Sequence, residues 1–554
     1  MDTGANRNGH ERQSAEGKDR LIEDAKDLDI LMKDVLPTLG HFPRSDASIA
    51  FALNELDMLL SEEDADSDVE EEDSDVLEYH EEKPVCDVKD TLKSHRIDFV
   101  LEYPHMTIVT TASLPWLTGT AVNPALRAAY LWHRGHDVTL LVPWIPKEDQ
   151  KNIFLSEDEL FDCPEDQLRV VEMHIRKRVP FEVQFHTGVA QESPALEIKF
   201  YNGKYAPALG SIIPTQDIQQ FVRKDTSCII LEEPEHLTWY HSGKRWIRAF
   251  DRHVPVVGVM HTNYVDYARR MAGEAASVTL KRLNKFLCRQ HTHKVIKLSG
   301  AVQRLPREQV CFVHGVSDGF LAVGREKDDI KFSKGAYFLG KALWAKGFEE
   351  LLDRMEEHVR ICDSSGKEVV TVDVYGHGKE FDDIKHEATE IRHLPLHFWG
   401  PKDHLSEDMV SYRVFVNPST SDVVATTSAE ALAMGKWLLV PKHPCNVFFE
   451  SFRNCLLYET GEQFSDLLMY AASNDPPPLS DEELNKLSWP CATDRFLFCC
   501  SDTNVERGKK LGITRVVNKT SWMGYNVGYG VYSIVTKAMD SVLRSISNNE
   551  GRRT

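Results

Sequence analysis

The sequence lacks the features that mark several common classes of protein. Its 11 cysteines are scattered and include no C-x-x-C pair, so neither a disulfide framework nor a thiolate metal site is indicated. No apolar run reaches the ~18–20 residues that a membrane-spanning helix requires. The N-terminus has neither a hydrophobic signal core nor the composition of a transit peptide. If the protein acts on a membrane, we expect it to bind the membrane surface.

The chain also lacks an excess of basic residues. Its 554 residues include 65 Lys and Arg against 86 Asp and Glu, which gives a formal net charge of -21 and argues against a nucleic-acid partner. Residues 61–82 contain 13 acidic side chains and no Lys or Arg. Such a run cannot bury enough apolar surface to fold by itself, so residues 1–95 are predicted to be a largely disordered acidic extension. The extension is either a solvated spacer or a regulatory tail.

Short apolar runs, separated by helical stretches, form two series along the chain. The runs of the first series are Met106–Ala112, His136–Val142, Cys228–Leu231 and Val254–Met260, and those of the second are Ala336–Leu339, Val369–Tyr375, Arg413–Val416 and Trp437–Val440. Strands that alternate with helices favour parallel sheets. The pattern predicts an α/β protein with two tandem Rossmann-like domains, residues 96–305 and 306–500. Residues 501–554 are expected to form a helical segment that crosses back to the first domain.

The first strand is followed by a loop that contains Gly119 and Thr120 and precedes a helix. Glycine lets a backbone approach a ligand closely, and the N-terminus of a helix favours anions. The loop lacks the G-x-G-x-x-G pattern of dinucleotide-binding proteins, which makes a nicotinamide or flavin cofactor a weak interpretation. A single glycine in such a turn is equally compatible with a structural role.

The second series of strands begins with a segment that carries two lysines. Gly340 and Lys341 follow the strand, and Lys346 stands five residues later. Two cations beside the N-terminus of a helix would neutralise a diphosphate. The alternative is that both are solvated surface lysines.

The most specific segment is 417–436. Asp422 stands just beyond a strand, Thr426 and Thr427 begin a predicted helix, and Glu430 lies on its first turn. A carboxylate in this place can accept hydrogen bonds from both hydroxyls of a ribose, while the first amides of the helix face phosphate. Glu430 also fits a capping box with Thr427, and the two roles are compatible.

These motifs resemble those of a known family. Asp422-x7-Glu430 is similar to the E-x7-E signature of the family-four retaining glycosyltransferases, and Gly340-Lys341…Lys346-Gly347 is similar to their G-R-x4-K-G motif. Segments 109–124, 231–240 and 261–264 narrow the resemblance to plant and algal digalactosyldiacylglycerol synthases, over residues 103–500. Asp422 and Lys341 depart from the usual Glu and Arg. The resemblance implies the B-type glycosyltransferase fold, in which two Rossmann-like domains face each other across a cleft.

The resemblance also implies an activity, namely transfer of galactose from UDP-galactose to monogalactosyldiacylglycerol with retention at the anomeric carbon. Open alternatives are another donor such as UDP-glucose, another lipid acceptor, or a non-catalytic scaffold. The implied donor-binding residues are Gly119, Thr120, Gly340, Lys341, Lys346, Thr426, Thr427 and Glu430, and the implied catalytic residues are His261, Asp422 and Glu430. The resemblance implies no obligatory cofactor or bound metal, although Mg²⁺ could stimulate the reaction. It also implies that the protein is a peripheral protein of the chloroplast outer envelope.

Two further regions are candidates for contact with the acceptor and the membrane. Glu232, Glu235 and His236 follow a strand and are assigned to the acceptor, although they could instead cap the next helix. Residues 280–297 combine basic and apolar side chains at helical spacing, with Arg282, Lys285, Phe286 and Arg289 as the predicted contacts to an anionic lipid surface. The alternative is an ordinary amphipathic helix that packs on the core.

Overall fold

The structure is a computed structural model that describes residues 99–154, 159–186, 194–206, 211–239, 244–251, 253–326 and 332–501. The predicted acidic extension, residues 1–95, and residues 502–554 lie outside the described residues. The chain divides into two compact units, one of which comprises Lys83–Arg270 and Leu280–Lys510 and contains both sheets. Of the other unit, the described part is Met271–Thr279, where one helix ends and the next begins. Within the described ranges, no helix has the length and apolarity to span a bilayer.

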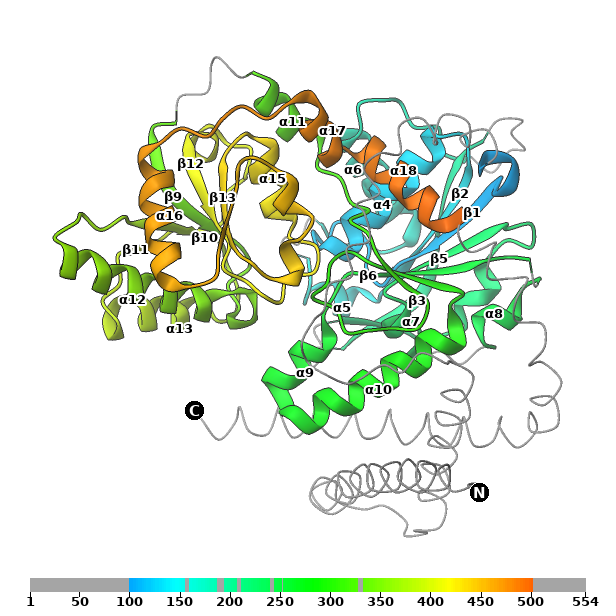
Figure 1. The fold of residues 1–554 in the computed structure, drawn as a ribbon. Helices are drawn as coiled ribbons and strands as arrows, with labels where there is room; N and C mark the ends of the chain where they lie inside the picture. Colours follow the sequence, from blue (N-terminus) through cyan, green and yellow to red (C-terminus); the bar gives the residue numbers. More distant parts are fainter. Residues whose placement is uncertain are drawn as a thin grey trace, which may run out of the picture. The chain divides into compact units, whose positions relative to one another are not determined.

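The first domain is built on an eight-stranded sheet (Figure 1). Its strands, in spatial order, are β4 Ser211–Pro214, β3 Leu196–Ala206, β2 Asp137–Trp144, β1 His105–Val109, β5 Cys228–Glu232, β6 Val256–Met260, β7 Lys294–Lys297 and β8 Glu308–Val310. Neighbouring strands are parallel except at the edge, where β4 pairs antiparallel with β3. The register aligns Val109 of β1 with both Leu141 of β2 and Leu231 of β5. The carboxyl ends of the central strands therefore meet at one edge of the sheet.

Helices cover both faces of this sheet. They are α4 Gly119–His133, α5 Lys147–Gln150, α6 Pro164–Arg178, the 3₁₀ turn η6 Ile218–Phe221, α7 Pro234–Trp239, α8 Trp246–Ala249, α9 Tyr264–Ala272 and α10 Glu274–His291. Alternate residues of each strand point to opposite faces, so Ile108 and Ile230 join one core with α4 while Val109 and Leu231 join another with α7 and α8. Helix α4 is rich in alanine, which favours the helix and lets it pack closely on the sheet.

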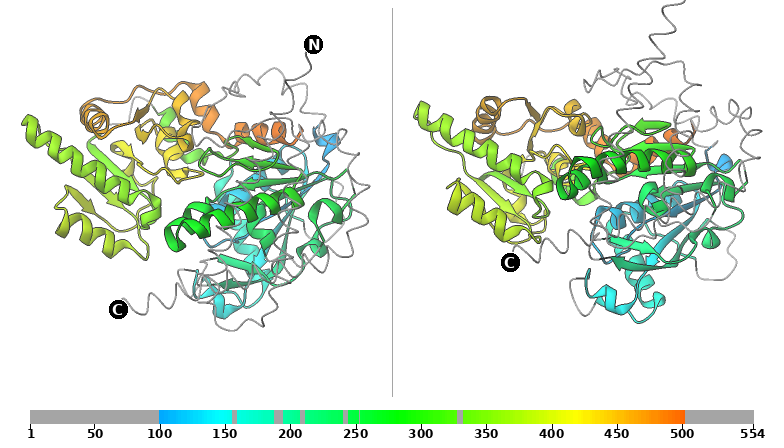
Figure 2. Two further views of the ribbon diagram at one scale, coloured as in Figure 1. Left: turned by 60° about the horizontal axis from the view of Figure 1, so that its bottom comes forward. Right: turned by 90° about the horizontal axis from the view of Figure 1, so that it is seen from below.

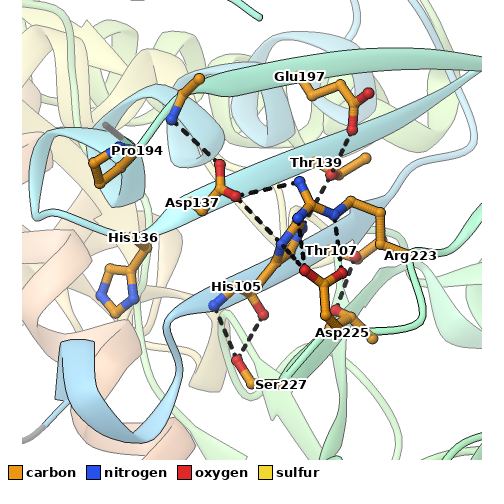
Figure 3. Close-up of polar contacts among 12 residues, drawn as sticks. His105, Thr107, His136, Asp137, Thr139, Pro194, Glu197, Arg223, Asp225 and Ser227 are labelled. Carbon is orange, nitrogen blue, oxygen red and sulfur yellow. Dashed lines mark hydrogen bonds and ion pairs between the residues drawn. The ribbon is translucent and has the colours of Figure 1, made fainter. Parts of the chain in front are cut away.

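Polar side chains connect the strands at the amino edge of the first sheet (Figure 3). Asp137 begins β2 and accepts a hydrogen bond from Arg223, with Nη1 and Oδ2 3.2 Å apart. Arg223 also pairs with Asp225, and the nearest oxygen and nitrogen are 2.6 Å apart. His105 lies beside Asp137, and its Nε2 is 3.1 Å from the hydroxyl of Thr139. These contacts join the first residues of β1 and β2 to the loop that precedes β5.

The second domain has a six-stranded sheet whose neighbouring strands are all parallel. In spatial order they are β11 Leu396–Phe398, β10 Val372–Tyr375, β9 Lys334–Leu339, β12 Tyr412–Val416, β13 Trp437–Pro441 and β14 Cys455–Tyr458. The longer helices of this part of the chain are α11 Asp318–Arg325, α12 Phe348–Ser365, α15 Thr426–Ala433, α16 Gly461–Ser473, α17 Asp481–Leu487 and α18 Trp489–Ser501. Its short helices and turns are η7 Trp344–Lys346, α13 Phe381–His386, the π-helical turn η8 Glu387–Ile391, α14 Glu407–Val410, η9 Pro444–Asn446 and η10 Phe449–Ser451.

The two faces of the second sheet contact different helices (Figures 1 and 2). Phe338 and Val414 point to the face covered by α12 and α16, whereas Tyr337 and Phe415 point to the face covered by α11, α15 and α17. This arrangement confirms the prediction of two tandem α/β domains with parallel sheets. The cleft expected between them stays a prediction.

Helix α18 follows the second sheet in the chain but packs on α4 of the first domain (Figure 1). The rings of Trp489 and Tyr130 are stacked with their centroids 5.8 Å apart, and Phe496 is buried in the same core. The return of the chain to the first domain therefore begins at Trp489.

Candidate active site

In parallel α/β sheets, the loops beyond the carboxyl ends of the strands form the ligand-binding edge. The donor-side residues predicted in the second domain follow β9 and β12, and His261 and Glu232 lie at the ends of β6 and β5. Each domain therefore has one such edge at which predicted site residues gather.

Two of the predicted donor-side residues are in direct contact in the second domain. Lys346 ends the turn η7 beyond β9, Asp422 lies in the loop beyond β12, and Nζ is 3.2 Å from Oδ1. The charge of Asp422 raises the pKa of Lys346. The same two segments are joined by a 2.7 Å hydrogen bond from the Ser421 hydroxyl to the carbonyl oxygen of Ala345. The fold thus joins residues 76 positions apart into one site.

Two positions at the carboxyl edge of the second sheet require glycine because of their backbone conformation and close contacts. Gly347 adopts a φ of 90°, and a Cβ at this position would lie 2.8 Å from Ser419. Gly376, at the end of β10, has a φ of 142°, and its Cβ would lie 1.9 Å from the carbonyl oxygen of Gly340. Larger residues at these two positions would separate the loops of β9, β10 and β12.

Lys341 lies in the same positive field as Lys346. Desolvation by the surrounding chain, together with the positive charges of Lys346 and Lys379, lowers the pKa of Lys341, which is exposed. Cations that repel one another in this way provide an environment that favours a multiply charged anion.

Thr426 and Thr427 begin helix α15, as predicted. The preceding residue, Ala425, has a left-handed backbone with φ 45°, which is uncommon for a residue with a side chain and is often found at functional positions. No described side chain caps this helix, so the first N–H groups of α15 are available to an anion.

Glu430 does not form the expected capping box. Its Oε2 lies 2.7 Å from Nδ1 of His404, which stands in the loop before α14. The Nε2 of His404 is in turn 2.7 Å from the hydroxyl of Tyr337 on β9. Glu430 is therefore held by a residue 26 positions away rather than by its own helix.

A buried ionic network lies at the carboxyl edge of the first domain. Glu232 accepts a hydrogen bond from Arg127 of α4, with Nε and Oε1 2.7 Å apart, and its other oxygen contacts Nε2 of His261. Arg127 also donates to the carbonyl oxygen of Val313, with Nη1 3.0 Å from the oxygen. Burial opposes ionisation of Glu232, but Arg127 and His261 outweigh it and lower the pKa of the carboxyl. The network holds the His261 imidazole by its Nε2 atom.

The neighbouring carboxylate, Glu233, has a left-handed backbone with φ 64°. It accepts hydrogen bonds from the hydroxyls of Thr111 and Thr262, and the donor and acceptor oxygens of the first are 2.8 Å apart. The loops beyond β1, β5 and β6 are therefore joined through one carboxylate.

Two histidine rings at this edge have nitrogen atoms without partners. Nδ1 of His261 and both ring nitrogens of His314 are buried and have no hydrogen-bond partner among the described residues. The two ring centroids are 4.9 Å apart. Burial, with the nearby charges of His261 and Arg127, lowers the pKa of His314 well below its ordinary value. Buried polar atoms of this kind require an explanation, and a ligand with hydroxyl groups would supply one.

The predicted acceptor residues are divided between two surroundings. Glu232 contacts His261, whereas Glu235 and His236 are buried within α7. His236 has its Nε2 2.7 Å from the hydroxyl of Ser211 on the edge strand β4. Burial and the charge of Glu233 raise the pKa of Glu235 well above its ordinary value, and neither of its carboxyl oxygens has a hydrogen-bond partner in the described chain.

The predicted loop beyond β1 lies at the N-terminus of α4. Gly119 is the first residue of this helix, so Gly119 and Thr120 belong to its first turn rather than to the loop before it. The hydroxyl of Thr110 donates to the carbonyl oxygen of Thr120, and the hydroxyls of Thr118 and Thr120 are 3.1 Å apart. Gly119 and Thr120 therefore lie at the N-terminus of a helix, where backbone N–H groups could contact an anion.

The membrane-docking helix predicted over residues 280–297 has different bounds in the structure. Helix α10 ends at His291, and residues 294–297 form β7, where Lys297 is buried and pairs with Glu308 at 3.0 Å. Arg282 and Lys285 are exposed, Arg289 is partly exposed, and Phe286 is partly buried against Leu280, Leu287 and Trp239. The apolar face of α10 thus packs on its own domain, and contact of its basic face with lipid stays a prediction.

Sequence reasoning missed several residues that hold the candidate site together. They are Arg127, Tyr337 and His404. Within the described part of the chain, no three His, Cys, Asp or Glu residues are arranged to hold a metal ion.

The chain is similar in sequence to several known proteins. No family model matches the chain. The chain is 44% identical over 402 residues to digalactosyldiacylglycerol synthase 1, chloroplastic, from Glycine max, covering 71% of this chain and 49% of that protein. It is 40% identical over 402 residues to digalactosyldiacylglycerol synthase 2, chloroplastic, from Arabidopsis thaliana, covering 71% of this chain and 80% of that protein. The chain belongs to the digalactosyldiacylglycerol synthase family.

The share of each relative's length that the chain covers differs between the two types of synthase. The chain spans about half the length of the type 1 relatives and about four fifths of the type 2 relatives. Among solved structures, it is similar to sucrose-phosphate synthase from Thermosynechococcus elongatus, with a TM-score of 0.45 and 13% identity over 73% of this chain and 99% of that chain.

Proposed function

We propose that this chain transfers galactose from UDP-galactose to monogalactosyldiacylglycerol and forms digalactosyldiacylglycerol with retention at the anomeric carbon. Relatives that are at least 39% identical to this chain are named digalactosyldiacylglycerol synthase. The observation that carries the proposal is the contact between Lys346 and Asp422, because it joins the two motifs that the donor requires.

The residues have distinct roles in the proposed reaction. Negative charge accumulates on the diphosphate as the bond to the sugar breaks, and cations and backbone amides that are already in place stabilise it. Lys341, Lys346 and the N-terminus of α15, with Thr426 and Thr427, supply these groups. Gly340 allows the loop beyond β9 to approach the phosphates, and Glu430 accepts hydrogen bonds from the ribose.

Two further residues act on the transferred sugar. Asp422 accepts hydrogen bonds from sugar hydroxyls once the donor occupies Lys346. His261 meets the sugar from the first domain, with Gly119 and Thr120 beside it, and its Nδ1 forms a hydrogen bond with a sugar hydroxyl because Glu232 engages Nε2. Glu232 acts through His261, and Glu235 and His236 are expected to shape the acceptor side from within α7.

The surroundings of the enzyme follow from its acceptor. A lipid substrate requires contact with a membrane surface, which we assign to the basic face of α10 with Arg282, Lys285 and Arg289, and with Phe286 at its border. Several relatives carry "chloroplastic" in their names, and we place this protein on the chloroplast outer envelope as a peripheral protein. Mg²⁺ is expected to stimulate the reaction by screening the diphosphate.

One assay tests the proposal. The purified chain is incubated with labelled UDP-galactose or UDP-glucose and with vesicles that contain monogalactosyldiacylglycerol, and the lipid product is identified. Label from UDP-galactose in digalactosyldiacylglycerol is the expected result. If label is transferred only from UDP-glucose, the donor is UDP-glucose and not UDP-galactose. If label is transferred from neither nucleotide-sugar, the proposed activity is rejected.

The assignment of the lysines has its own test. Lys341→Ala and Lys346→Ala should each weaken UDP binding in calorimetry, and the double variant should lose less than the sum because both cations face one diphosphate. Lys367→Ala, at the far end of α12, is the matched control. Normal UDP binding by both single variants would place the diphosphate elsewhere.

A further inference from the structure

A chain of two hydrogen bonds runs from the interior of the second sheet to the rim of the candidate donor site. It begins at the hydroxyl of Tyr337 on β9, passes through the imidazole of His404, and ends at the carboxylate of Glu430 on α15. Each link is 2.7 Å long. The three residues come from separate elements, so the chain is a product of the tertiary fold.

The direction of the chain follows from burial and charge. Tyr337 is completely buried, and burial together with the charge of Glu430 raises the pKa of its phenol well above the ordinary value. The phenol therefore keeps its proton. The carboxylate of Glu430 can only accept, so Nδ1 of His404 carries the hydrogen of that link. In this tautomer of the neutral imidazole, Nε2 accepts a hydrogen bond from the hydroxyl of Tyr337.

The histidine is fixed on its other sides as well. His404 is 6% exposed, and its ring lies against the rings of Phe320 and Phe415, with centroids 5.6 Å and 6.0 Å away. Its orientation is set by packing before any ligand arrives. Glu430 itself lies at the rim, with its side chain 19% exposed.

We propose that Tyr337 and His404 are positioning residues that orient Glu430 toward two adjacent hydroxyls of the nucleotide ribose. This inference rests on the proposed function, in which Glu430 contacts the ribose. His404 engages Oε2 and leaves Oε1 for the ligand, and it restricts the rotation of a side chain that would otherwise lose this freedom when the ligand binds. A carboxylate fixed in advance binds a diol more tightly than a mobile one.

Two substitutions of the histidine separate positioning from packing. The side-chain amide of His404→Asn overlies Nδ1 and can still donate to Glu430, whereas that of His404→Gln overlies Nε2 and reaches toward Tyr337. His358 is a matched control because it is also buried in the same domain, 0% exposed against 6% for His404, with Nδ1 2.8 Å from the hydroxyl of Ser465. We expect His358→Gln to leave nucleotide affinity unchanged.

The experiment measures the affinity of the full chain for UDP and for 2′,3′-dideoxy-UDP by calorimetry. His404→Gln should weaken UDP roughly tenfold, the scale for an impaired hydrogen bond to a charged group, and should leave dideoxy-UDP unaffected. His404→Asn should retain UDP affinity within about threefold, and Tyr337→Phe should lie between the two. In transfer assays, His404→Gln should raise KM for the donor more than it lowers kcat.

The outcomes distinguish the inference from the proposed function. If the unmodified chain binds UDP and dideoxy-UDP equally, Glu430 does not contact the ribose, and both proposals for that residue fail. If the unmodified chain prefers UDP but His404→Gln keeps the same preference, the positioning role alone is rejected. Equal losses for both nucleotides in His404→Gln and His404→Asn would show that the histidine only supports packing.

Discussion

At the amino edge of the first sheet, His105, Asp137 and Arg223 contact one another and the strands beside them (Figure 3). Each edge has buried histidine nitrogens without a hydrogen-bond partner among the described residues, at His105 and His136 on the amino side and at His261 and His314 on the carboxyl side. Both edges are rich in charge, so polarity does not distinguish them. The difference is that Arg223 at the amino edge is partly exposed and paired, while Arg127 and Glu232 at the carboxyl edge are completely buried.

This difference explains how a fold separates stability from function. At the amino edge, Asp137 and Asp225 pair with Arg223, and these charged side chains are partly exposed, so solvent screens them. At the carboxyl edge, Glu232 holds one nitrogen of His261 and leaves the other buried and unpartnered within the described residues, as are both nitrogens of His314. The completely buried ion pair beside unpartnered nitrogens is therefore the feature that distinguishes the carboxyl edge.

The largest effect is expected for Arg127→Met. This change removes the guanidinium from the buried carboxylate of Glu232 and leaves only its contact with His261, and loss of one partner of a buried pair costs about 3–5 kcal/mol. Urea denaturation of the variant and the unmodified chain measures the difference. A loss below about 1 kcal/mol would mean that Glu232 is solvated and that the two edges are alike.

A second large effect should appear in binding rather than in stability. Glu430→Gln keeps the shape of the side chain but removes its charge, and a lost hydrogen bond to a charged group costs roughly 1.5–3 kcal/mol. UDP affinity and turnover should fall while the denaturation midpoint stays close to that of the unmodified chain. Retained affinity and turnover in the folded variant would remove Glu430 from the ribose site.

His314→Leu should separate stability from function at the carboxyl edge. The substitution replaces a ring with two buried, unpartnered nitrogens by an apolar side chain of similar size, which should be neutral or stabilise the fold by about 1 kcal/mol. Galactosyl transfer should fall in the same variant if the nitrogens meet the sugar or acceptor. A destabilised but fully active variant would show that His314 is structural.

The sequence predicted the central strands well because they are buried on both faces and read as continuous apolar runs, as in β1 and β12. It missed β3, where Lys199 and Asn202 alternate with apolar residues on a partly exposed strand, and it missed the three-residue strands β8 and β11. It also extended α10 into β7, because basic and apolar residues continue across Thr292 without a break in composition.

The candidate site was predictable where it is local. Lys341, Lys346 and Asp422 stand in the segments that follow β9 and β12, Glu430 lies in α15 beyond its first turn, and their spacing is visible in the sequence. Residues that hold them were not predictable in this way. Arg127 meets Glu232 across 105 positions and His404 meets Glu430 across 26, and such pairings arise only when the chain is folded.

The smallest effect is expected for Arg223→Gln at the amino edge. A hydrogen bond from Arg223 lowers the pKa of Asp225 to about 2 from an ordinary value of 3.8, so the pair adds stability above the ordinary pKa and loses it as pH falls toward 2. The side chain of Asp225 is 63% exposed, so solvent screens the pair and the loss at neutral pH should be no more than about 1 kcal/mol. Denaturation at pH 7 and pH 2.5 should show a small difference between the two chains that shrinks in acid, with galactosyl transfer unchanged. A loss as large as that of Arg127→Met, or a loss of transfer, would show that the amino edge supports the active site as closely as the carboxyl edge does.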